Sequence, residues 1–389
     1  MYSKRPYQMI WKIYLGDILA MKNWFSKAKE YMPIGTMIVF AFTIISAIVF
    51  LLYLFIVPFA DIFNQYISAP FRIALSYITS IVPFSIAEII LITMPFWLGL
   101  LIFLACKAGR KGKKESVRFF CYVLSLLCIV FITYVWTNTS GFYNTKIEDK
   151  LGLDRNNLTK EELYQSTIIV IDNLNELSSK VEYSEDNSSI MPYSYSIMSS
   201  KICDAYDSFV EKHNILVNFR SRIKPIMLSK PMTYTHLSGV YVCMTGESNV
   251  NVNYPDFVIA STSAHEMAHQ RGFAREDECN FLSFAVLHQS DDDFLKYSAY
   301  LDVFSYLLGD LRAADKALYD EAVARLDVKV KKDYNSYVAF FKEYADSPAA
   351  DVTDKVNDSF LQANGQESGT KSYRLFTELA CAYLLNRTK

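Results

Sequence analysis

The stretch Ser263–Phe281, SAHEMAHQRGFAREDECNF, is a polar segment in a chain of 389 residues of which 51% are hydrophobic. It contains two of the five histidines, His265 and His269, four positions apart. Residues four apart lie on the same face of an α-helix, so both imidazoles can reach one ion. The stretch therefore predicts a metal site on a helix.

The helix that carries these histidines is expected to begin at Pro255-Asp256, with Asp256 as its cap, and to end at Gly272. Glu266 lies about 100° round the helix axis from His265, which suits a base beside the ion better than a ligand. This is the H-E-x-x-H pattern, in which two histidines bind Zn²⁺ and the glutamate is the general base toward a zinc-bound water. The pattern points to hydrolysis, because Zn²⁺ lowers the pKa of a bound water to about 7.

The third ligand is sought just after the helix. One branch of the zincin peptidases places a third histidine where this chain has Arg275, which cannot bind a metal. EDECN (276–280) instead resembles the E-x-x-A-D signature of glutamate-type zincins, and this resemblance makes Glu276 the third ligand. Asn280 lies one turn further on, where it could hydrogen-bond a histidine ligand. Glu278 is the alternative ligand, because the apolar residues of this second helix do not decide which side faces the ion.

Three apolar segments precede the histidine stretch: 31–60, which has no charged residue, about 82–106, and about 119–136. Roughly 20 apolar residues are enough to cross a bilayer as a helix. We therefore expect a three-helix transmembrane region over residues 31–138. Glu88 lies near the start of the second segment, and an interfacial carboxylate at a helix end is favoured over a place on an ion path.

The orientation follows from the basic residues. Residues 1–30 are basic, and the link between the second and third segments, KAGRKGKKESVR (107–118), carries six Lys or Arg, whereas the first link carries only Arg72. Basic loops remain in the cytoplasm. Residues 1–30 are therefore expected to be cytoplasmic, and a C-terminal domain over 145–389 is expected outside the cell membrane.

The outer domain is predicted to be mostly helical with a small sheet. A helix is expected from about residue 160, with Thr159 and Glu162 as a capping box. Further helices are expected at about 198–216, 292–312, 314–326, 330–346 and 370–386. The segment GVYVCMTGESNVNV (239–252) is rich in β-branched and aromatic residues and predicts a strand or hairpin.

Charge and cysteine content exclude some classes. The net charge of −2 gives no indication of nucleic-acid binding. The seven cysteines include no C-x-x-C pair, so neither a disulfide framework nor a cysteine zinc site is expected, although one bridge among the last four is left open. The charged residues around the histidines also argue against a protease site inside the bilayer.

The motif HEMAHQRGFAREDECNF closely resembles the signature of a bacterial membrane family, the domain-of-unknown-function family 3810. The similarity extends to SGVYVCMTGESNVN upstream, to SAYLDVFSYLL and GTKSYRLFTEL downstream, and to the three apolar segments. Cys279, where the family has alanine, is a mild departure.

The resemblance implies a membrane-anchored zinc metallopeptidase with a zincin-like α+β domain. In zincins an edge strand before the active-site helix pairs with the substrate, and Gly239–Met244 has that place. Tyr373 and Tyr300 are candidates for stabilising the transition state. The expected partners are the lipid bilayer and a peptide or protein substrate near the membrane surface. The alternative is a non-catalytic zinc-binding sensor or scaffold on the same anchor.

Overall fold

The computed structural model describes residues 29–366 and 373–388, and the side chains of residues 373 and 374 are outside this description. Most of the basic segment 1–30 therefore lies outside the described residues. The chain divides into two compact units, one from Met1–Val49 and Ile90–Thr133, the other from Phe50–Ile89 and Tyr134–Lys389. Each unit is described by itself below.

Within the described part of the chain, three helices are long and apolar enough to cross a membrane: α2 (Ile34–Phe55), α5 (Ile86–Lys111) and α6 (Lys113–Tyr134). The last continues through a π-helical turn, η2 (Val135–Thr139), into α7 (Ser140–Tyr143). Only 11%, 0% and 17% of the residues in their most apolar windows are buried inside the protein. Such uncovered apolar surface is typical of helices that face lipid, so the three predicted spans are confirmed as candidate membrane helices.

The link between the first two spans is helical and belongs to the second unit. It forms α3 (Val57–Phe63), η1 (Asn64–Ser68) and α4 (Ala69–Thr79). Arg72, which the sequence placed in this link, is 2% exposed, and its guanidinium donates to the carbonyl oxygens of Thr137 (3.0 Å) and Asn64 (3.2 Å). The link is therefore part of the folded domain.

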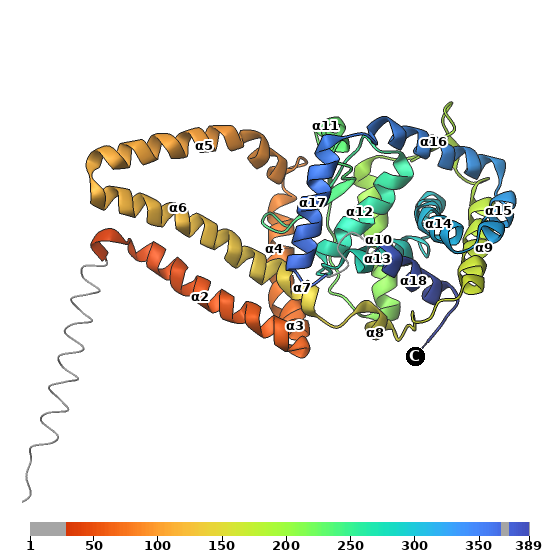
Figure 1. Ribbon diagram of the computed structural model, residues 1–389, viewed down its shortest axis with the longest axis horizontal. Coiled ribbons are helices and arrows are strands. Elements are labelled where there is room, and N and C mark those ends of the chain that lie inside the picture. Colours follow the sequence, from red (N-terminus) through yellow and green to blue (C-terminus); the bar gives the residue numbers. More distant parts are fainter. Residues whose placement is uncertain (1–28, 367–372, 389) are drawn as a thin grey trace, which may run out of the picture. The chain divides into compact units, whose positions relative to one another are not determined.

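Most of the second unit is helical (Figure 1). The predicted helices correspond to α9 (Lys160–Leu177), α10 (Tyr195–His213), α14 (Asp293–Ala314), α15 (Lys316–Ala324), α16 (Val328–Tyr344) and α18 (Tyr373–Leu384). The Thr159–Glu162 capping box is present at the start of α9. Two short helices, α8 (Ile147–Leu151) and α11 (Ser229–Thr233), and one longer helix, α17 (Pro348–Ala363), were not predicted.

The described residues of this unit form two small sheets. Strands β1 (Glu182–Tyr183) and β2 (Ser189–Ile190) form an antiparallel pair. Strands β3 (Ile223–Pro225), β4 (Gly239–Val242) and β5 (Glu247–Val250) form a sheet in the order β3-β5-β4. The segment predicted as a strand or hairpin forms a hairpin, because β4 and β5 pair antiparallel. Strand β3 pairs parallel to β5 on its other side.

A buried ion pair joins this sheet to the start of α5. The Glu247 carboxylate on β5 accepts hydrogen bonds from the backbone N–H groups of Ile86 and Ala87, both at 2.9 Å, and so satisfies two free donors at the helix N-terminus. Lys224 Nζ on β3 lies 2.5 Å from Glu247 Oε1 and also donates to the carbonyl of Thr79. Both charged side chains are at most 1% exposed.

Glu88, in the first turn of α5, makes a second contact between this helix and the domain. Its carboxylate accepts hydrogen bonds from the backbone N–H groups of Met227 (2.9 Å) and Leu228 (2.7 Å). This position fits the favoured prediction of a carboxylate at a helix end.

Helix α12 (Asp256–Gln270) lies at the centre of the unit and packs against α13 (Glu276–Leu287), α14 and β5. Twelve of its fifteen residues are buried. The predicted cap is wrong: Pro255 precedes the first turn, and the Asp256 carboxylate accepts from the N–H of Met191 at 2.8 Å instead. The predicted stop is close to correct, because Gly272 follows the helix with φ +100°.

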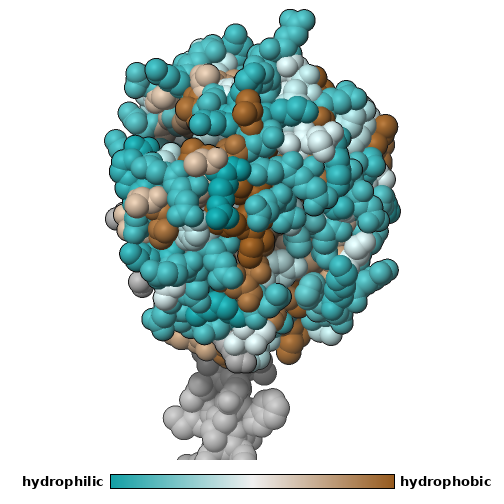
Figure 2. All heavy atoms as spheres, turned by 90° about the vertical axis from the view of Figure 1, so that its right-hand side faces the viewer, coloured by the Kyte–Doolittle hydropathy of each residue, from teal (hydrophilic) through white to brown (hydrophobic). Residues whose placement is uncertain are grey.

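The surface and the cysteines complete the picture of this unit. The face shown in Figure 2 is largely hydrophilic, with apolar side chains gathered in a narrow band.

All seven cysteines are free, so the bridge that the sequence left open is absent.

Candidate metal centre

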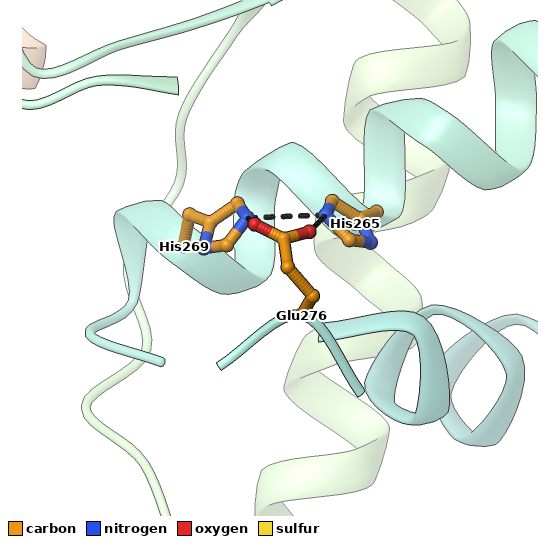
Figure 3. A group of neighbouring side chains, drawn as sticks. All are labelled: His265, His269 and Glu276. Carbon is orange, nitrogen blue, oxygen red and sulfur yellow. Dashed lines mark hydrogen bonds and ion pairs between the residues drawn. The ribbon is translucent and has the colours of Figure 1, made fainter. Parts of the chain in front are cut away.

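Three side chains converge at one end of α12. His265 and His269 project from the same face of this helix, and Glu276 reaches them from the first position of α13 (Figure 3). One ligand atom from each lies within 4.8 Å of the others. Their side chains are 14%, 12% and 29% exposed, so the group is open to solvent on one side.

The spacing of these atoms fits a zinc ion. The two Nε2 atoms are 3.0 Å apart, and the Glu276 oxygens lie 3.2 Å from His265 Nε2 and 3.6 Å from His269 Nε2. Ligand atoms about 2.0–2.1 Å from a tetrahedral ion lie about 3.3–3.4 Å from one another. The three side chains could therefore hold one metal ion together.

Both imidazoles are held by their other nitrogen. His265 Nδ1 lies 2.7 Å from Asn280 Oδ1, and His269 Nδ1 lies 2.9 Å from the carbonyl oxygen of Phe273. An oxygen acceptor at Nδ1 favours the proton there, which leaves the Nε2 lone pair free to bind a metal. The structure thus places Asn280 in the role expected for it from the sequence.

The structure separates the two candidate third ligands. Glu278 is 1% exposed, accepts from Arg275 at 2.7 Å and accepts from the backbone N–H of Ile147 at 3.0 Å. Its carboxylate therefore hydrogen-bonds these groups and not the two histidines. Among the described residues only Glu276 joins both histidines.

The charges of the three residues are coupled. Burial by itself lowers the pKa of His265, but the hydrogen bond and charge of Glu276 outweigh it and raise this pKa to about 9. Burial would raise the pKa of Glu276, but His269 and His265 together lower it to about 2. Burial lowers the pKa of His269 to about 4. Without a metal, the group therefore holds one proton on His265 at neutral pH.

Glu266 lies beside this group on the same helix. Its side chain is buried, which raises its pKa to about 8, and it accepts a hydrogen bond from the backbone N–H of Tyr241 on β4. Gly239 on β4 makes room for it, because a Cβ at that position would stand 2.7 Å from Glu266 Oε1 and 2.5 Å from Thr262 Cγ2. Sheet and helix together thus fix the position of this carboxylate.

Cys279 packs behind the histidines. Its Sγ lies 3.3 Å from His269 Nδ1, on the opposite side of the ring from the Nε2 that faces Glu276. Burial raises the pKa of this thiol well above its usual value, so it stays protonated. Cys279 therefore fills the place of a small apolar residue, as the sequence comparison suggested.

The two tyrosines proposed as transition-state stabilisers differ in what the structure shows. Tyr373 begins α18, but its side chain lies outside the described residues. Tyr300 is 7% exposed and packs against Phe284 and His288, near the C-terminal end of α13. Among the described residues, no hydrogen bond or ring contact connects Tyr300 to His265, His269 or Glu276.

Two residues near the centre were not identified from the sequence. The Tyr241 ring stacks parallel to His269 at 6.4 Å between ring centroids, and its hydroxyl has no hydrogen-bond partner among the described residues. Asp302 on α14 interacts electrostatically with His265. Burial raises the pKa of Asp302 to about 7, and the charge of His265 opposes this shift. The sequence signal for Asp302 would have been its position as a single acidic residue among the apolar residues of α14.

A comparison with known protein families agrees with the resemblance seen in the sequence. The model of the family described as "Protein of unknown function (DUF3810)" matches residues 59–381. No curated protein and no solved structure matches the chain. The matched region contains α12, α13 and two of the three candidate membrane helices.

Proposed function

The chain is a member of the DUF3810 family, and we propose that it is a zinc-dependent peptidase anchored in a membrane. The observation that carries this proposal is the convergence of His265, His269 and Glu276 with a buried carboxylate, Glu266, beside them. A site that only bound a metal would not need Glu266. The zincin-like character of the helical domain is part of the proposal.

Zinc is the metal that these ligands suit best. Two imidazole nitrogens and one carboxylate oxygen form a common catalytic zinc set that leaves a fourth position open. When bound there, Zn²⁺ would act as a Lewis acid and make water a nucleophile at neutral pH. His265, His269 and Glu276 would hold it, with Asn280 and the Phe273 carbonyl fixing the two rings.

Glu266 would act as the general base. A dication held by the two histidines would stabilise its carboxylate and lower the pKa of Glu266 from the value of about 8 in the metal-free chain. The ionised carboxylate would accept a proton from water and return it to the leaving amine. Tyr373 remains the candidate for stabilising the developing oxyanion, and Tyr373→Phe should lower kcat more than it changes KM.

A peptide substrate would bind along β4. This strand stands at the edge of its sheet, and its other side pairs with β5. An extended peptide could add to that edge by backbone hydrogen bonds, beside Glu266. We further propose, from the basic residues of the chain, that this domain lies outside the cytoplasm, where its substrates would be peptides or proteins near the membrane surface.

The first experiment is the metal content of the purified full-length protein, with His265→Ala and Glu276→Ala beside it. We expect near-stoichiometric zinc in the native chain and loss of zinc in both variants. Zinc that persists without Glu276 would remove this residue from the ligand set. A native chain without zinc under metal-replete conditions would exclude the peptidase.

Glu266→Gln separates the peptidase from the alternative, a non-catalytic zinc-binding sensor or scaffold. The amide keeps the size of the side chain but cannot accept the proton. We expect this variant to retain zinc and to lose hydrolysis in a peptide-library screen. Native protein that binds zinc and cleaves no peptide would support the sensor or scaffold instead.

A further inference from the structure

Helix α17 (Pro348–Ala363) carries an apolar face that the described structure leaves largely exposed. Val352, Val356 and Phe360 are 62%, 64% and 42% exposed. Ala349 and Ala363 are exposed at the two ends of the same row. The spacing of three and four residues places all five on one side of the helix, along about 20 Å of its length.

The other sides of α17 account for its remaining contacts. Ala350 and Leu361 are buried and lie about 100° round the axis from the apolar row, so they mark the side that packs on the domain. Asp351 and Lys355 lie on the remaining side and are exposed. The helix thus has a protein-facing side, a polar side and an unpartnered apolar side.

The C-terminal end of α17 is tied to the end of the third candidate span. The Phe360 ring contacts the rings of Tyr134 and Phe142 at 6.1 and 6.0 Å between centroids. The Tyr134 hydroxyl donates to Asn364 Oδ1 at 2.6 Å. Tyr134 is the last residue of α6 and Phe142 lies in α7, so this end of the row meets the point where that helix leaves its apolar stretch (Figure 1).

The N-terminal end of α17 is tied to the region that holds the second span. Ser347, which precedes the helix, donates to the carbonyl of Tyr234 at 2.5 Å, just after α11. The segment before α11 is held by Glu88, in the first turn of α5, through the N–H groups of Met227 and Leu228. Met227 and Leu228 are themselves 57% and 45% exposed. A second apolar spot therefore lies beside the start of that span.

We propose that the apolar row of α17, together with Met227 and Leu228, lies in the lipid interface of the membrane that the three helices cross. The row is continuous with the end of one span, and the second spot adjoins the end of another, so a lipid surface meets both. A helix with one apolar and one charged side lies in the plane of such an interface. This arrangement would hold the domain against the membrane at points besides its covalent links.

The charges of α17 indicate whether an anionic or a zwitterionic lipid surface contacts it. Three aspartates and one lysine lie on this helix. Its net negative charge gives no attraction to anionic headgroups, so the occupant is a zwitterionic lipid surface. Added phosphatidylserine should therefore not strengthen binding.

Photo-crosslinking of the full-length protein tests this inference. The photoreactive residue benzoylphenylalanine replaces Val356, and the protein is reconstituted in phosphatidylcholine vesicles. Val328, at the start of α16, is the matched control, because it is a valine with 65% exposure against 64% for Val356. Asp351, on the polar side of α17, is a second control on the same helix. All three positions are exposed, so the substitutions should leave the fold intact.

We expect lipid adducts at position 356 to exceed those at 328 and 351 by about tenfold or more. Equal lipid labelling at all three positions, or none at 356, would overturn the inference. Adducts between two copies of the chain at 356, in place of lipid, would also overturn it and assign the row to self-association. None of these outcomes depends on zinc or on peptidase activity.

Discussion

The charge coupling at the candidate metal centre predicts how zinc affinity depends on pH. His265 has a pKa of about 9 in the metal-free chain because Glu276 stabilises its charged form. Zinc must displace that proton. At pH 7 about one molecule in a hundred has a neutral His265, so displacement costs about 2.7 kcal/mol. Because His269 (pKa about 4) is neutral and Glu276 (pKa about 2) ionised at that pH, neither adds a proton.

Zinc affinity should increase with pH. A ligand whose pKa is raised holds its proton until the pH passes that value, so affinity rises with pH up to about 9. Glu266, with a pKa of about 8 without the metal, also loses its proton when zinc binds, so the native protein should release close to two protons per zinc at pH 7. In a Glu266→Gln background, which removes this second group, we expect about one proton per zinc and a zinc association constant that increases about tenfold per pH unit between pH 6 and 8.5.

Glu276→Gln supplies the internal control. Without the carboxylate charge, burial dominates and the pKa of His265 should fall to or below its usual value. In the same Glu266→Gln background this variant should bind zinc more weakly overall, yet its affinity should change little above pH 7.

Chelator competition at four pH values, with proton release measured by calorimetry in buffers of different ionisation enthalpy, checks both expectations. A native protein that releases no proton at pH 7 would refute the reasoning. So would a Glu276→Gln variant that keeps the tenfold slope.

Three further predictions concern the support of the site. Glu247→Gln leaves Lys224 buried without a counter-charge and weakens the cap on α5, so it should lower the stability of the detergent-solubilised protein by about 3–5 kcal/mol, measured by chemical denaturation. Glu266→Gln should stabilise the metal-free protein by up to a few kcal/mol at pH 8–9 and by little at pH 4, in thermal melts, because the raised pKa of Glu266 means that its ionisation destabilises the fold as pH rises. Gly239→Ala should abolish peptide hydrolysis while zinc content is retained, because its Cβ would displace the carboxylate of Glu266 and the side chain of Thr262.

A surface ion pair provides the control for the first of these predictions. Lys316 and Asp320 are paired at 2.7 Å but are 76% and 58% exposed. Asp320→Asn should therefore cost less than about 1 kcal/mol. A Glu247→Gln variant as stable as Asp320→Asn would contradict the assigned role of the buried pair.

Local sequence patterns were sufficient for much of the fold. Long apolar runs predicted the three candidate membrane helices because bilayer thickness sets a minimum length. The four-residue spacing of His265 and His269 predicted their shared face because helix geometry is regular. The Thr159–Glu162 box and the β4–β5 hairpin were also predicted, since caps and turns depend on neighbouring residues.

Helix α17 and the cap of α12 show where local patterns fail. The segment of α17 was left unassigned, because its few large apolar residues are spread among polar ones. Asp256 has the residue type of a cap, but its carboxylate bonds Met191, 65 residues away. Competition from a distant donor overrides a local preference of about 1 kcal/mol.

By itself, the sequence determined the elements and the chemical types at the centre: two histidines and a base on one helix, with acids just beyond it. Only the tertiary structure placed Glu276 beside both histidines and Glu278 away from them, because Arg275 and the backbone of Ile147 hydrogen-bond the Glu278 carboxylate. It also folded the first interspan link into the domain, where Arg72 is buried. The physical reason is the same in both cases. A buried carboxylate or guanidinium needs hydrogen-bond or ion-pair partners, and these partners come from segments that are distant in the sequence.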